Sequence, residues 1–385
     1  MTRKLYYEDP RLTSFSAKVI SCEERDGAYC VTLDQTAFYP EGGGQAGDTG
    51  ALSSVRVTDT QMEDGEIVHR CAGPLEAGTT VEGEIDWPRR FELMRRHAGE
   101  HIVSGLIHRL YGLNNVGFHM GAEDTTVDVS GRLTPEQLRQ VERMANEIVA
   151  RNETVRAWYP DPQTLAKTEY RCKKELTGDV RLVEIPGADV CACCGLHVTR
   201  TGEIGPILLA GWEHFHEGMR LRLLCGQQAV EAAFSAMDQC RSAGALLSAK
   251  PDGVLAAAER MAAELGQTKL RLSRMTRTAA AAIAEQYRGR GDVLLFVEGF
   301  DGGELGKLAG QTAASSGGVC AVFCPDGAGF RFALSGPGVR DLCARMTKEL
   351  SGRGGGRDQL AQGAVTATER QIREFFRAAE TEETP

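Results

Sequence analysis

Alternating polar and apolar positions dominate the first 90 residues of the chain. Runs such as 17–21, 29–33 and 55–58 place apolar side chains at about every second residue, and stretches rich in Gly and Asp separate them. A period of two is that of half-buried β-strands. The pattern therefore predicts a small β-barrel or sandwich over residues 1–90.

After residue 90 the apolar positions recur every three or four residues. This spacing predicts a helix over 91–112 that ends at Gly112. A second helix is expected over 134–151, because Thr134 and Gln137 form the sequence pattern of a capping box. Extended runs and turns follow, so residues 91–226 are interpreted as a compact α+β domain.

The remaining sequence divides into a helical and a mixed part. Residues 227–290 are alanine-rich with near-heptad apolar spacing and are interrupted at 250–253, which predicts a helical arm or hairpin. Residues 291–385 alternate strand-like and helix-like segments, which predicts a small α/β domain. Its glycine-rich stretch 351–358 is expected to be a loop. The predicted fold class is α+β and multidomain.

Composition adds the broad class. The chain has 385 residues, of which 42% are hydrophobic and 25% charged, as in ordinary globular proteins. It has no apolar run long enough to span a membrane and no apolar core of a signal peptide, so a cytoplasmic protein is expected. In that compartment the 12 cysteines are expected to remain reduced thiols or to bind metal rather than to form disulfides.

The charge balance excludes a globally basic nucleic-acid-binding protein, because the formal net charge is −9. One local exception lies in the predicted arm, where a basic stripe can bind phosphates even on an acidic protein. The alternative is a solvated helix face. The stripe includes Lys269, Arg271, Arg274 and Arg277.

Two pairs of residues have the spacing of metal ligands. His97 and His101 lie four apart on the first predicted helix and therefore share one face. Cys193 and His197 form a second pair at the same spacing. Either pair alone is a weak signal, but together they predict a zinc site of one thiolate and three imidazoles. The segment 97–101 also matches the H-x-x-E-H pattern of zinc peptidases, in which Glu100 would be the general base. This is a remote alternative, because Cys193 and His197 would close the coordination site that a peptidase leaves open.

With these motifs in order, the chain resembles the freestanding alanyl-tRNA editing proteins of the AlaX group, in their long form with a DHH-associated C-terminal domain. These proteins are relatives of the editing domain of alanyl-tRNA synthetase. The resemblance covers nearly the whole length. It is carried by segments 36–45, 47–50, 97–101, 117–121, 193–197, 201–205, 218–220, 354–357 and 361–363.

The resemblance implies hydrolysis of the ester in tRNA(Ala) mischarged with serine or glycine, with one zinc ion per chain held by the two ligand pairs. Thr36 would read the serine hydroxyl, and Gln45 would hold water or substrate. Glu100 is expected to be a solvated helix residue. No synthetase catalytic domain precedes the editing signature, so aminoacylation is not expected. A homodimer through the arm or the C-terminal domain is implied by analogy. The expected tRNA contacts are the basic stripe together with Gly354, Gly355, Gly356 and Arg357.

The sequence departs from the family pattern beside the ligands. Cys194 and Leu196 replace a glycine and a threonine of the usual Cys-Gly-Gly-Thr-His, and Ala98-Gly99 replaces Thr-Ala. These departures concern the wall of the pocket, and hence specificity or rate. They also leave a second hypothesis of a different class, a tRNA-binding or adaptor protein of the same fold without catalysis.

Overall fold

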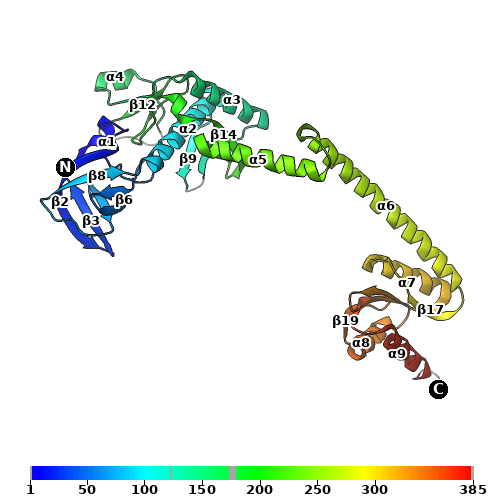
Figure 1. Cartoon of the computed structure of the whole chain (residues 1–385). Helices are drawn as coiled ribbons and strands as arrows, with labels where there is room; N and C mark the ends of the chain where they lie inside the picture. The colour runs from blue at the N-terminus through cyan, green and yellow to red at the C-terminus, as the bar shows by residue number, and fades with distance from the viewer. Residues whose placement is uncertain (1, 122–123, 173–178, 383–385) are drawn as a thin grey trace. The chain divides into compact units, whose positions relative to one another are not determined.

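The structure is a computed structural model that describes residues 2–121, 124–172 and 179–382. The chain forms two compact units, residues 1–240 and 241–385 (Figure 1). Each unit mixes helices with β-sheet. Among the described residues, no helix is both long enough and apolar enough to cross a lipid bilayer.

The first unit begins with a closed six-stranded barrel, in the order β2-β3-β7-β6-β5-β8. Alternate residues of its strands fill the interior, among them Phe15, Val31 and Val57. A helical turn, α1 (Leu5–Glu8), and a parallel pair of short strands, β1 (Arg3–Lys4) and β4 (Gln35–Thr36), lie beside it. The barrel strands are β2 (Ser14–Arg25), β3 (Ala28–Leu33), β5 (Gly50–Leu52), β6 (Val55–Glu63), β7 (Glu66–Cys71) and β8 (Thr80–Ile85).

Helix α2 (Trp87–Tyr111) is the central element of the rest of this unit. Asp86 caps its N-terminus by accepting from Arg89 N, and Gly112 ends it with a φ of 68°. The helix is buried along most of its length because it contacts α3 (Pro135–Arg151) and strands of two sheets. The remaining short elements are α4 (Pro162–Lys167) and the 3₁₀ turn η1 (Thr201–Ile204).

The two sheets that α2 contacts are both antiparallel. One has the order β14-β15-β10-β9 and the other β11-β12-β13. Their strands are β9 (Asn115–Met120), β10 (Thr125–Val129), β11 (Arg156–Trp158), β12 (Leu182–Ile185), β13 (Asp189–Ala192), β14 (Ile207–Phe215) and β15 (Gly218–Cys225).

A buried ion pair joins α2 to the glycine-rich segment that follows β4. The Arg90 guanidinium donates to the Asp48 carboxylate and to the Ala37 carbonyl, and both charged side chains are almost fully buried. Asp48 also accepts from Tyr39 N at 2.6 Å. This contact fixes the turn at residues 42–45 relative to the helix.

The second unit is a five-stranded sheet in the order β16-β17-β18-β20-β19, with helices on both faces. Alternate residues of β17 enter two separate cores, one against α6 and α7 and the other against α8 and α9. Helix α5 (Gly226–Leu246) spans the boundary between the units. The elements of the second unit are η2 (Pro251–Gly253), α6 (Val254–Gln286), β16 (Gly291–Phe296), α7 (Gly302–Ser316), β17 (Gly317–Asp326), β18 (Gly329–Ser335), α8 (Val339–Glu349), β19 (Gly352–Arg357), β20 (Leu360–Val365) and α9 (Glu369–Glu382).

One prediction for this unit is wrong. Gly354, Gly355, Gly356 and Arg357 do not form a loop but belong to β19, an edge strand paired with β20. Glycine is required here because the strands approach closely: a Cβ at Gly356 would lie 2.1 Å from the Leu360 carbonyl oxygen. A phosphate-binding loop at these residues is therefore not present.

Candidate metal centre

The four predicted ligands converge from two distant parts of the chain. His97 and His101 project from the same face of α2, and Cys193 and His197 lie in the segment after β13. One ligand atom from each residue lies within 4.8 Å of the others. Cys193 Sγ is 3.4 Å from His97 Nε2, close to the separation of about 3.5 Å between two ligands of a tetrahedral zinc ion.

The donor atoms fit a metal ion. His197 is buried, and neither of its ring nitrogens forms a hydrogen bond of good geometry, although the Cys193 thiol lies close enough to interact with the ring. A buried polar atom without a partner is costly, and coordination of an ion would satisfy it. One thiolate and three imidazoles form a donor set that zinc accepts in closed, four-coordinate sites. The residues present therefore fit zinc.

The electrostatics of the cluster favour the ligand forms of His197 and Cys193. Burial lowers the pKa of His197 to about 3, so its imidazole is neutral near pH 7. Burial opposes ionisation of Cys193, but its close interactions with His97, His101 and His197 outweigh burial, and the pKa of the thiol falls well below its usual value. The Cys193 thiolate and the neutral His197 imidazole are forms that bind a metal cation. Burial opposes protonation of His101, but contacts with Asp189 and Cys193 outweigh it and raise the pKa of His101 well above its usual value, so a bound cation would have to displace a proton from that ring.

Gln45 holds the first histidine in place. Its Oε1 lies 3.2 Å from His97 Nδ1 and accepts from Leu196 N at 3.0 Å. Because an amide oxygen only accepts, Nδ1 carries the hydrogen and Nε2 is left to bind a metal ion. Gln45 is fully buried, and it contacts the His97 ligand and the backbone of the residue before His197. It was predicted to hold water or substrate, but its oxygen is already used by the protein.

Asp189 faces the second histidine, and the sequence reasoning missed it. Its Oδ2 lies 3.3 Å from His101 Nδ1, at ion-pair distance although without good hydrogen-bond alignment. Arg171 donates to both carboxylate oxygens at 2.7 and 2.6 Å. Burial opposes ionisation, yet contacts with His101 and Arg171 lower the pKa of Asp189 to about 2. Carboxylates commonly orient metal-binding histidines in this way. The available signal was an acid four residues before Cys193.

Glu100 is buried, not solvated as the sequence suggested. Its Oε1 accepts from Ser104 Oγ at 2.6 Å and from Asn115 Nδ2, and its Oε2 lies 4.0 Å from His101 Nε2. The peptidase alternative required an acidic third ligand and an open position. The four-residue donor group instead has three imidazoles and one thiolate, which can form a closed set; Asp189 belongs to a second group with His101 and Cys191.

Thr36 is not placed as predicted. Its side chain is fully buried beside the barrel, where Oγ1 lies 2.8 Å from His69 Nε2 and accepts from Phe38 N at 3.0 Å. It does not line the cavity next to the candidate ligands. Both hydrogen-bond partners of the Thr36 hydroxyl come from the barrel region, so the hydroxyl is not available in the cavity to bind the hydroxyl of a serine substrate.

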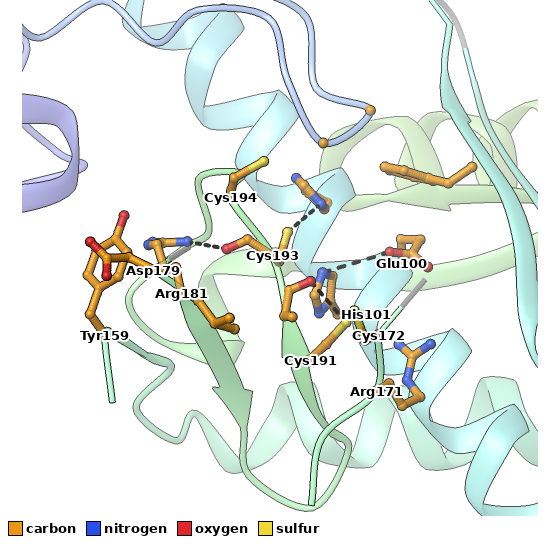
Figure 2. Close-up of a pocket in the computed structure, with 16 residues that line it drawn as sticks. Glu100, His101, Tyr159, Arg171, Cys172, Asp179, Arg181, Cys191, Cys193 and Cys194 are labelled. Carbon is orange, nitrogen blue, oxygen red and sulfur yellow. Dashed lines mark hydrogen bonds and ion pairs between the residues drawn. The ribbon is translucent and has the colours of Figure 1, made fainter. Parts of the chain in front are cut away.

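A cavity of about 510 Å³ opens beside the ligands (Figure 2). His97 and His101 lie in its wall with Phe118, whereas the exposed Cys194 and Tyr159 lie in another part of that wall. The whole lining is Gly43, Gly44, His97, Glu100, His101, Phe118, Tyr159, Arg171, Cys172, Asp179, Val180, Arg181, Cys191, Ala192, Cys193 and Cys194.

Cys194 and Leu196, the two departures from the family pattern beside Cys193, lie in different surroundings in the structure. Cys194 lines the cavity, where its Sγ approaches Tyr39 Oη at 3.9 Å. Leu196 is fully buried in the core instead. Gly195 must remain glycine, because a Cβ there would lie 2.1 Å from His97 Cε1. Of the two new side chains, Cys194 is therefore the one that can meet a ligand in the cavity.

The predicted tRNA-contacting residues lie in the second unit. Lys269, Arg271, Arg274 and Arg277 are exposed on α6. Apolar side chains on the same helix are also exposed at near-heptad spacing, namely Met261, Leu265, Leu272 and Met275.

Two family profiles match the chain. Residues 10–89 match the class II (A) tRNA synthetases, and residues 180–220 match the second additional domain of threonyl and alanyl tRNA synthetases. The first match lies over the closed barrel, and the second includes Cys193 and His197.

Full-length relatives match over most of this chain. Alanine–tRNA ligases from Methanopyrus kandleri and Methanoculleus marisnigri are 31% and 35% identical over 94% of the chain, which spans 42% and 41% of their lengths. The crystal structure of the C-Ala domain from Aquifex aeolicus alanyl-tRNA synthetase matches 23% of this chain and 87% of its own, with 21% identity and a TM-score of 0.21.

Proposed function

Because this chain is related to the alanyl-tRNA synthetases, we propose that it is an aminoacyl-tRNA deacylase. Its substrate would be tRNA(Ala) wrongly charged with serine or glycine, and it would hydrolyse the ester to the terminal ribose. The observation that carries the proposal is the cluster of His97, His101, Cys193 and His197 beside an open cavity.

The chemistry of the reaction suits this site. An aminoacyl ester is already activated, so a catalyst needs chiefly to position the ester, admit water and stabilise the charge that develops on the carbonyl oxygen. Zinc, when bound by the four ligands, would supply a fixed positive charge at this position. Gln45 and Asp189 hold the imidazoles at Nδ1, which keeps the Nε2 atoms directed into the cluster.

The wall of the cavity supplies further groups. Glu100 presents a buried carboxylate beside His101, held by Ser104 and Asn115. Phe118 packs against His97 with ring centroids 5.3 Å apart and adds an apolar surface to the wall. These residues can orient an aminoacyl group that carries a charged amine.

Helix α6 supports two proposals on partners. Its exposed basic residues, with Arg271 and Arg274 among them, would bind the phosphates of tRNA. Its exposed apolar residues, such as Leu265 and Leu272, have the spacing of a coiled-coil seam and would pair with a second copy of the chain. Sedimentation of the variant L265E/L272E as a monomer, beside a wild-type dimer, would support the second proposal.

The test is hydrolysis of Ser-tRNA(Ala), Gly-tRNA(Ala) and Ala-tRNA(Ala), with zinc measured in the same samples. We expect one zinc ion per chain and faster release of serine than of alanine. Cys193→Ala should lose metal and activity together, whereas the matched variant Cys194→Ala should keep its zinc. Full hydrolysis by zinc-free protein would refute the metal-dependent site. Binding of tRNA(Ala) without hydrolysis by zinc-loaded protein would instead support an adaptor protein.

A further inference from the structure

The part of the cavity wall formed by Tyr159 and Arg181 has no role in the chemistry described so far. We propose that Tyr159, supported by Tyr7 and Arg181, is a stacking platform for a purine base, the terminal adenine of the charged tRNA. This inference rests on the proposed function, because it locates the nucleoside to which the ester is attached.

Tyr159 is an aromatic side chain in a cavity wall that remains open to solvent. It follows β11, lines the cavity and is 52% exposed. Its ring meets Tyr7 edge to face, with centroids 6.3 Å apart and planes at 76°. An edge-to-face partner supports the ring and leaves at least one of its faces uncovered by that partner. Pro160 follows directly and restricts the backbone of Tyr159.

The platform is tied to the segment that carries a candidate metal ligand. Arg181 Nη1 donates to the carbonyls of Cys193 and Gly195 at 3.0 and 2.9 Å, and its guanidinium lies 4.8 Å from the centre of the Tyr7 ring. Tyr7 Oη donates to the Cys194 carbonyl at 2.8 Å. Figure 2 shows Tyr159 beside Arg181, and the Arg181 contact with Cys193 as a dashed line. Arg181 and Tyr7 are therefore held by direct hydrogen bonds to the segment that carries Cys193, and Tyr159 contacts this framework through the Tyr7 ring.

A nucleoside fits this arrangement better than a peptide does. In an aminoacyl-tRNA the ester oxygen belongs to the ribose of the terminal adenosine, so an ester at the His97 cluster places the base a short distance away in the same cavity. Every base has a π-face, and stacking on an aromatic side chain stabilises binding without a hydrogen-bond code. The cation of Arg181 adds favourable charge near a phosphodiester chain.

The experiment compares two esters of serine in the zinc-loaded full-length protein. One is 3′-O-seryladenosine and the other is serine methyl ester, which has no base. Tyr159→Ala should lower the preference for seryladenosine, as a ratio of kcat/KM values, by roughly 5- to 150-fold, the range for one stacked base. The loss should appear mainly in KM. Tyr159→Phe should retain the preference, and Trp212→Ala, an exposed aromatic outside the cavity lining, should leave it unchanged.

Binding of the non-hydrolysable 3′-serylamido-3′-deoxyadenosine separates this inference from the proposed function. If wild type hydrolyses both esters and Tyr159→Ala keeps the preference, the platform is wrong and the deacylase stands. If wild type hydrolyses neither ester but binds the amide in a Tyr159-dependent way, the platform stands and the deacylase is wrong. The platform would be overturned if Tyr159→Ala lowered kcat/KM equally for both esters. It would also be overturned if the wild-type protein preferred an ester of a seryl peptide to seryladenosine.

Discussion

Gln45 provides the sharpest test of how the candidate metal centre is built. The sequence suggested that this side chain holds water or substrate, whereas in the structure its Oε1 faces His97 Nδ1 and accepts from Leu196 N. Gln45→Leu keeps the approximate volume and removes the acceptor. A role in holding the ligands predicts loss of metal, whereas a role at the substrate predicts loss of rate alone.

The magnitude follows from the two donors that would lose their acceptor. A buried donor left unsatisfied costs about 1–3 kcal/mol, so the folded state should lose about 2–6 kcal/mol in total. Loss of a residue that orients a metal-binding histidine typically lowers metal affinity about 10- to 100-fold. We expect Gln45→Leu to lower zinc affinity by that factor and hydrolysis with it.

The assay is competition for zinc with a colorimetric chelator, with thermal unfolding measured on the same samples. Gln45→Glu is the matched control, because it keeps an acceptor of the same length. The Gln45 Nε2 that it removes has no hydrogen-bond partner in the structure. We expect the Glu variant to retain zinc. Wild-type zinc affinity in Gln45→Leu together with a large loss of hydrolysis would refute this reasoning and favour contact with the substrate.

Three further predictions concern other parts of the chain. Thr36→Val should leave the ratio of Ser-tRNA(Ala) to Ala-tRNA(Ala) hydrolysis unchanged and lower the unfolding temperature, because the Thr36 hydroxyl forms hydrogen bonds with His69 and Phe38 N within the barrel region. A smaller serine-to-alanine ratio in this variant would place Thr36 at the substrate. Burial lowers the pKa of His69 from 6.5 to about 4. Between these pH values the unfolded chain binds more protons than the folded protein, so the free energy of unfolding should fall with decreasing pH, by up to about 3 kcal/mol near pH 4. If His69→Gln leaves the pH profile of denaturant unfolding unaltered, this prediction is contradicted. Replacing Arg271, Arg274 and Arg277 together by alanine should weaken tRNA binding and reduce its log–log salt slope by up to about 3, because each phosphate contact contributes about 0.9; an unchanged slope would exclude the stripe from the interface.

Local sequence signals predicted the two long helices α2 and α3 of the first unit, but not the short helices α1 and α4. The capping box of α3 is present, with Thr134 and Gln137 bonded as their spacing suggested. Gly112 ends α2 in the left-handed conformation. Such signals work because the interactions lie within one turn of the residues that make them.

Signals that depend on tertiary contacts were not visible in the sequence. A loop was predicted at Gly352–Arg357 because glycine disfavours strands, yet the close approach of β20 requires glycine at Gly352, Gly354 and Gly356. The sequence predicted Glu100 to be a surface residue, whereas in the structure it is buried and accepts hydrogen bonds from Ser104 and Asn115. Ligand spacing found the four candidate ligands, whereas Asp189 and Gln45 act through contacts that no short motif records.

The two ligand pairs are separated by more than ninety residues, and this separation has a consequence for synthesis of the chain. During translation the His97–His101 pair emerges long before Cys193 and His197, and two imidazoles hold zinc far more weakly than four donors do. Tight binding of an ion must wait until α2 has docked against β13 and the segment that follows it. Bound metal would then mark chains in which these distant segments have met, and withdrawal of zinc should trap newly made protein in a state that proteases cleave readily.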